Sequence, residues 1–70
     1  MPLSLAPIQQ TLTVARIACD AKQANHLAAL GLVKGAKIEA LSSSGGAVIL
    51  ILKGSRIALD HSTAARIFVA

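Results

Sequence analysis

Residues 27–38, which read LAALGLVKGAKI, predict a helix that ends at one glycine, a turn at a second glycine and a strand that follows directly. Gly31 suits the position after the helix, where the chain turns left-handed most easily without a Cβ. Leu32 would then fold back onto Leu27, the apolar contact of a Schellman ending. Lys34 and Gly35 suit the centre of a type II turn, with positive φ at the glycine. This helix–turn–strand unit decides most of the fold.

The pattern outside this unit predicts short elements on both sides. Before it, a strand at about Thr11–Ile17 leads to the helix at about Ala21–Leu30, with Asp20 as the N-cap and Gln23 at capping-box spacing. A hairpin loop at 42–46, a tight turn at 53–54 and a turn at 61–65 then separate four strands, at about Lys37–Leu41, Ala47–Leu52, Arg56–Leu59 and Arg66–Val69. Five strands with one helix after the first predict a mainly β fold, a small, partly open SH3-like barrel.

Length and composition limit the classes of protein. Seventy residues make one small domain, and we expect it to occupy residues 1–70. The single cysteine, Cys19, cannot form an internal disulfide, so the core must be aliphatic, as the 54% hydrophobic content allows. A homo-oligomer would bury further apolar surface. The first residues lack the features of a secretory signal and the longest apolar run is too short for a membrane span, so we expect a cytoplasmic protein.

The net charge of +4 raises the possibility of nucleic-acid binding. The seven lysines and arginines are scattered singly along the sequence, and Phe68 is the only aromatic residue that could stack on a base. This distribution favours ordinary solubilising charge.

The sequence contains no convincing catalytic constellation. Cys19, Asp20 and His26 lie near each other in sequence, but one precedes the predicted helix and another lies within it, so nothing holds a thiol and a base together. Asp60 and His61 are adjacent candidates for a metal site binding iron(II) or zinc. Adjacent side chains at a strand end point apart, which argues against their use in one site. We therefore expect no enzyme, no catalytic residue and no cofactor.

The strand predicted at Ala47–Leu52 is apolar on both faces. A barrel strand normally alternates between an apolar inner face and a wet outer face. Either the helix covers the second face or another protein does, and Phe68 is expected to extend the same outward patch. An exposed apolar patch of this kind marks an interaction site.

The chain resembles the ferrous iron transport protein A (FeoA) family of small bacterial proteins over nearly its whole length. The matching positions are Leu3-Ser4-Leu5, Leu27–Leu32 with Gly35 and Ile38, Gly54, Ile57-Ala58-Leu59, and Ala64 with Ile67 and Val69. Relatives often carry arginine where His26 and Asp60 stand and proline where Lys34 stands, so surface charge differs at any partner contact made there. Their loop near Gly45-Gly46 is also longer.

The resemblance implies an SH3-like cytoplasmic accessory protein that acts on FeoB, a membrane iron transporter with a cytoplasmic GTP-binding domain. Such a protein would meet the membrane only through its partner. We expect the partner-binding surface to comprise residues at the helix end and on the outer face of the third strand, namely Leu27, Leu30, Leu32, Val48, Leu50 and Phe68. Leu27 could instead belong to the core.

Two other functions remain open from the sequence. One is a small basic barrel that binds nucleic acid, whose affinity would fall steeply as salt rises. The other is a metal-sensing regulatory domain that uses Asp60 and His61.

Overall fold

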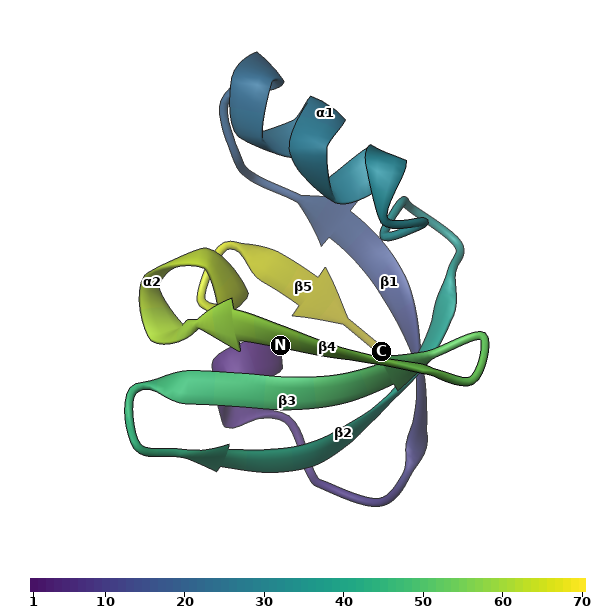
Figure 1. Cartoon of the computed structure of the whole chain (residues 1–70), viewed down its shortest axis with the longest axis vertical. Helices are drawn as coiled ribbons and strands as arrows, with labels where there is room; N and C mark the ends of the chain where they lie inside the picture. The colour runs from purple at the N-terminus through teal and green to yellow at the C-terminus, as the bar shows by residue number, and fades with distance from the viewer.

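The computed structural model describes residues 1–70 and contains a strongly bent five-stranded antiparallel sheet (Figure 1). The strand order is β4-β3-β2-β1-β5. The strands are β1 (Thr11–Ile17), β2 (Lys37–Ser44), β3 (Ala47–Leu52), β4 (Ser55–Asp60) and β5 (Ile67–Val69). The helical segments are a 3-10 turn η1 (Leu3–Leu5), α1 (Ala21–Ala29) and the short α2 (His61–Ala64). The predicted mainly β, SH3-like architecture with a helix after the first strand is confirmed.

The sheet bends where two strands carry irregularities. β1 pairs with β2 through Thr11–Thr13 and with β5 through the rest of its length, with a register shift between Val14 and Arg16. A second shift lies in β2, between Ala40 and Ser42. Because such irregularities increase local twist, they curl the sheet around one set of side chains. β4 and β5 are joined through α2 and do not pair, so the barrel stays partly open.

Helix α1 begins and ends as the sequence predicts. The Gln23 N–H donates to the Asp20 carboxylate at 2.8 Å, which is the expected N-cap bond. At the other end, the Leu32 N–H donates to the Leu27 carbonyl at 3.0 Å, and the Gly31 N–H to the Ala28 carbonyl at 2.9 Å. Together with the φ of 90° at Gly31, these two bonds define a Schellman ending.

The turn after the helix is fastened to the sheet. The Ala36 N–H donates to the Val33 carbonyl at 3.0 Å, and Gly35 has a φ of 90°, as a type II turn requires. The Gly35 N–H in turn donates to the Val14 carbonyl at 2.7 Å, and the Val14 N–H donates to the Ala36 carbonyl at 2.9 Å. The connection between α1 and β2 is therefore held at the helix and at the middle of β1.

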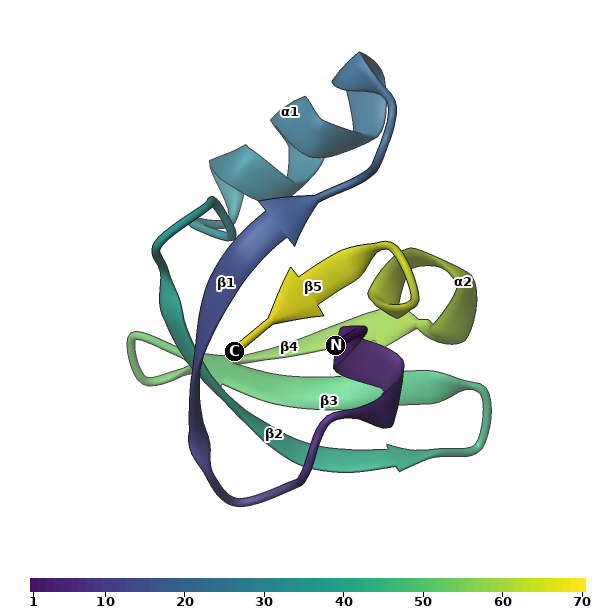
Figure 2. The ribbon, with the colours of Figure 1, turned by 180° about the vertical axis from the view of Figure 1, so that it is seen from behind.

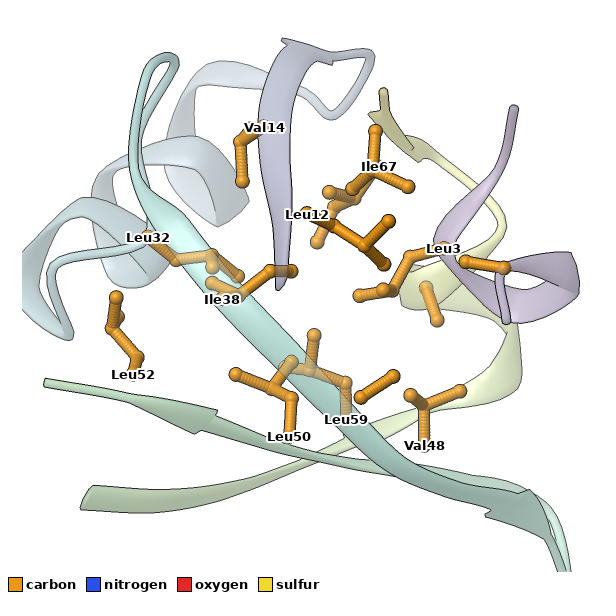
Figure 3. Close-up of a cluster of buried hydrophobic side chains, with 14 of the residues drawn as sticks. Leu3, Leu12, Val14, Leu32, Ile38, Val48, Leu50, Leu52, Leu59 and Ile67 are labelled. Atoms are coloured by element: carbon orange, nitrogen blue, oxygen red, sulfur yellow. The ribbon is translucent and has the colours of Figure 1, made fainter. Parts of the chain in front are cut away.

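The core is wholly aliphatic and fills the concave side of the sheet (Figure 3). Figure 3 shows side chains from all the strands converging on one interior, with Leu3 of η1 closing one side. The fully buried large side chains are Leu3, Leu27, Leu32, Leu50, Ile67, Val14, Val48 and Val69. None of the helices has the length and hydrophobicity needed to traverse a bilayer.

Two segments differ most from the sequence prediction, whereas the other element boundaries lie within one residue of it. β2 runs on through Ser44, although three successive serines suggested a loop from residue 42. Ser42, Ser43 and Ser44 each find a partner in β3, so the turn contracts to Gly45-Gly46. Ladder pairing overrides the low strand preference of the serines here. Residues 61–64 form one turn of helix, where the sequence suggested only an irregular turn.

Candidate functional site

A pocket of about 460 Å³ opens where the α1–β2 connection meets the β3–β4 turn. Both segments lie at the right of Figure 1 and at the left of Figure 2, which views the molecule from behind. The residues that line the pocket are Gly31, Val33, Lys34, Gly35, Ala36, Lys37, Leu52 and Lys53. The wall is close-packed at one point, since a Cβ on Gly31 would lie 3.4 Å from Leu52 Cδ2.

Apolar side chains stand exposed beside this pocket. Leu30 is 45% exposed and Val33 is 44% exposed, which places both among the few large hydrophobic residues at the surface. Val33 lines the pocket, and Leu30 immediately precedes Gly31, which also lines it. Both belong to the connection that hydrogen bonds fasten at two points, so they are presented in a fixed geometry.

Three lysines surround the same pocket. Lys34 and Lys37 come from the α1–β2 connection and the start of β2, while Lys53 comes from the β3–β4 turn. Lys37 Nζ donates to Thr13 Oγ1 at 3.3 Å. The sequence suggested scattered charge because Lys53 is 16 positions beyond Lys37. The antiparallel hairpin of β2 and β3 brings the end of β3, and with it Lys53, back to the start of β2 at Lys37. We call Leu30, Val33, Lys34, Lys37 and Lys53 the rim.

Of the six residues predicted to contact a partner, four are core residues. Leu27 is 1% exposed, and Leu32, Val48 and Leu50 are all fully buried. Assigning these four to an accessible surface is therefore wrong, and the alternative stated for Leu27, membership of the core, is correct. The Schellman ending turns Leu32 inward beside Leu27, and the register of β3 sends Val48 and Leu50 into the barrel. Leu30 is the one member at the helix end that does face outward.

The outward face of β3 carries Ala47, Ile49 and Ile51, all half-buried. Their neighbours across the sheet are polar or small: Ile49 pairs with Ser42 and Ala58, and Ile51 pairs with Glu39 and Arg56. Helix α1 lies beyond β1, away from this face, so it is not the cover that the sequence suggested (Figure 1). The outward face of β3 is therefore not covered by another element. Its side chains are nevertheless only partly exposed, because each is half-buried among its neighbours in the sheet.

Phe68 does not extend the β3 face. It lies on β5, at the far edge of the strand order, and pairs with Arg16 of β1. The Arg16 guanidinium carbon lies 4.6 Å from the centre of the Phe68 ring, a cation–π arrangement. Pro2 forms an isolated bridge to Phe68. The ring is consequently half-buried by its own neighbours. Phe68 therefore does not present the open apolar surface that its predicted role in partner binding requires.

Asp60 and His61 stand at the end of β4 and the start of α2. Ser62 Oγ donates to Asp60 Oδ2 at 2.6 Å, and this bond, followed by the bond from the Thr63 hydroxyl, lowers the pKa of the Asp60 carboxyl below its ordinary value. No group of three or more histidine, cysteine, aspartate or glutamate side chains that could hold a metal ion occurs in the structure. Asp60 and His61 therefore gain no third ligand here.

Cys19 is half-buried and packs against the core. Asp20 uses its carboxylate to cap α1, while His26 is exposed near the other end of that helix. The structure thus gives these three residues separate positions rather than one constellation.

A family comparison covers the chain from end to end, matching the model of the FeoA domain over residues 1–70. The chain belongs to the FeoA family. This is a family of small accessory proteins associated with ferrous iron uptake, and the predicted resemblance is confirmed. A comparison with curated proteins finds no match.

Solved structures of FeoA proteins share the fold. One, described as an iron uptake regulatory protein (FeoA), is 28% identical with a TM-score of 0.88; the match covers 99% of this chain and 93% of that one. The FeoA protein from Chlorobium tepidum is 25% identical with a TM-score of 0.85, covering 99% and 68%. ScaR with bound Zn²⁺ is 24% identical with a TM-score of 0.86, but this chain spans only 35% of it, so that likeness concerns the fold alone.

Proposed function

We propose that this FeoA-family protein is a non-enzymatic cytoplasmic accessory protein that binds the FeoB membrane transporter and modulates iron(II) uptake. Family membership supports the link to ferrous iron. The observation that carries the docking role is the exposure of Leu30 and Val33 on a connection fastened at both ends. Preorganised apolar side chains lose little conformational entropy on binding, so they suit a docking surface.

The expected contribution of these two side chains follows from their exposed area. Fully burying a valine or leucine side chain stabilises by about 1.5–3 kcal/mol, and roughly half of each side chain is still exposed. Covering both would contribute about 2 kcal/mol, which corresponds to roughly 30-fold in affinity.

A capture experiment tests the proposal directly. The chain would be immobilised and offered detergent-solubilised FeoB from the same genome at physiological salt. We expect the wild type to retain FeoB and Leu30→Ser/Val33→Ser to retain far less. Leu5→Ser is the matched control, because Leu5 is 77% exposed on η1, outside the rim. Failure of the wild type to retain FeoB would refute the proposed function, whereas equal retention by the double variant would refute the surface.

A further inference from the structure

We propose that the pocket beside the α1–β2 connection binds an acidic peptide segment of the protein partner, with an apolar side chain seated in the pocket and carboxylates beside Lys34, Lys37 and Lys53. This inference rests on the proposed function, since it names the chemistry that the docking surface recognises.

The size and walls of the pocket suit one apolar side chain with its flanking backbone. Its volume of about 460 Å³ lies within the range of sites that hold small ligands. Val33, Ala36 and Leu52 supply the apolar part of the lining, and Leu52 is itself buried. Burial of an apolar side chain against these walls would supply affinity without requiring a buried polar partner.

All the charged residues that line the pocket are positively charged. No acidic residue lines the pocket, while three of its eight lining residues are lysines. Asp20 caps the far end of α1, and Asp60 lies at the end of β4 opposite the β3–β4 turn. Glu39, two residues along β2 from Lys37, is the remaining acidic residue of the chain. The resulting positive potential attracts anionic segments and speeds their encounter.

The backbone at this site argues against a phosphate group as the ligand. Phosphate cradles use free backbone N–H groups of glycine-rich turns. Here the N–H groups of Gly31, Leu32, Gly35 and Ala36 all donate to carbonyls of the chain itself. The glycine N–H groups that would form such a cradle are therefore already used. The lysine side chains, which can reach carboxylates spaced along a peptide, and the apolar walls remain as the main binding elements.

The concave shape argues against a lipid surface. An anionic bilayer also offers negative charge above an apolar interior, but Ala36 and Leu52 line a hollow. A peptide segment can enter that hollow, whereas a bilayer surface would leave its walls uncovered.

The test is an NMR titration of the ¹⁵N-labelled chain with the peptide acetyl-Asp-Glu-Leu-Asp-Glu-amide. We expect shifts at residues 31–37 and 52–53, and affinity that falls about tenfold between 50 and 500 mM salt because the charges are screened. The neutral peptide acetyl-Asn-Gln-Leu-Asn-Gln-amide should bind at least about tenfold more weakly. Equal affinity for the two peptides, or shifts elsewhere on the chain, would overturn the inference.

Charge-reversal variants supply the second arm. Lys34→Glu/Lys53→Glu should lose about tenfold or more in affinity for the acidic peptide. Lys22→Glu/Arg66→Glu has the same net charge but changes exposed residues outside the pocket, so it should bind like the wild type. Thermal unfolding of both would show that they fold. The assignment to a peptide would be overturned if inorganic phosphate or phosphatidylglycerol vesicles produced the same chemical shift changes more strongly than the peptide does.

The two proposals fail in different ways. If the wild type captures FeoB, and Lys34→Glu/Lys53→Glu captures it equally well at low and high salt, the acidic-segment inference is wrong while the proposed function stands. If the acidic peptide binds the pocket but FeoB is not captured, the partner is wrong while the chemistry of the pocket stands.

Discussion

Two pairs of aliphatic side chains within residues 27–33 have opposite environments. Leu27 and Leu32 are 1% and 0% exposed, whereas Leu30 and Val33 are 45% and 44% exposed. Hydrophobicity does not distinguish the pairs. The difference comes from the reversal of the chain at Gly31, which turns Leu32 back beside Leu27 and leaves its neighbours outside. One short segment thus completes the core with one pair and presents a surface with the other.

The comparison predicts that stability and partner binding can be changed separately within this segment. Substitution of the inner pair should lower the free energy of unfolding. Substitution of the outer pair should weaken docking alone.

The largest effect is expected at the inner pair. Leu32→Ala should lower the free energy of unfolding by about 2–5 kcal/mol, because it removes a fully buried side chain and leaves a cavity. Urea unfolding followed by circular dichroism would measure it. Leu5→Ala, at an exposed site, is the control and should change stability by less than about 0.5 kcal/mol. A loss below about 1 kcal/mol at Leu32 would contradict its place in the core.

The second-largest effect is expected at Gly31, where the chain reverses direction. Gly31→Ala should destabilise the protein by about 1–2 kcal/mol, because an L-residue is strained at a φ of 90°. Gly31→Asn should lose less, since asparagine tolerates left-handed conformations better. The measurement is again the urea midpoint at constant m-value. If Gly31→Ala were as stable as the wild type, the Schellman ending would not determine which leucines face inward.

The start of the helix should contribute less. Asp20→Ala should cost about 1 kcal/mol through loss of the bond from the Gln23 N–H, while Asp20→Asn should retain most of the stability. Thermal unfolding of the two variants would compare them. Equal losses in both would show that charge rather than capping matters at this position.

The outer pair should affect stability least. Leu30→Ser/Val33→Ser should change the free energy of unfolding by no more than about 1 kcal/mol per site, because roughly half of each side chain is exposed to solvent. Unfolding curves measured beside the capture experiment would check this. A large loss of stability would mean that these residues support the fold, and reduced FeoB capture could not then be assigned to a docking surface.

Local sequence signals predicted the elements of this fold well. Asp20, Gly31 and Gly35 each take the predicted role. Gln23 does not complete a capping box, because its side-chain amide donates to Thr63 Oγ1 at 2.8 Å, a residue 40 positions away in sequence. β1 and β3 also begin and end where their patterns predicted. The extension of β2 through Ser44 was missed because it depends on pairing with β3, which no local preference encodes.

The surface was predicted less well than the fold. Both faces of β3 are apolar, so its sequence alone does not show which face turns inward. That choice depends on the register in which β3 pairs with its neighbouring strands. Val33 was missed although it lies within the segment that decides the fold. The gathering of Lys53 with Lys34 and Lys37 was also missed, because a hairpin brings distant positions together. A signal for Val33 was present: two positions after Gly31, it is an apolar residue in a turn.

Hydrogen–deuterium exchange of this chain, free and bound to full-length FeoB in detergent, tests the central claim most directly. If the outer pair and the lysines form the docking surface, amides of residues 30–37 and 52–54 should gain protection, and this gain should disappear with Leu30→Ser/Val33→Ser. Protection confined to β5, to η1 or to the serine-rich end of β2, with these residues unchanged, would contradict the account.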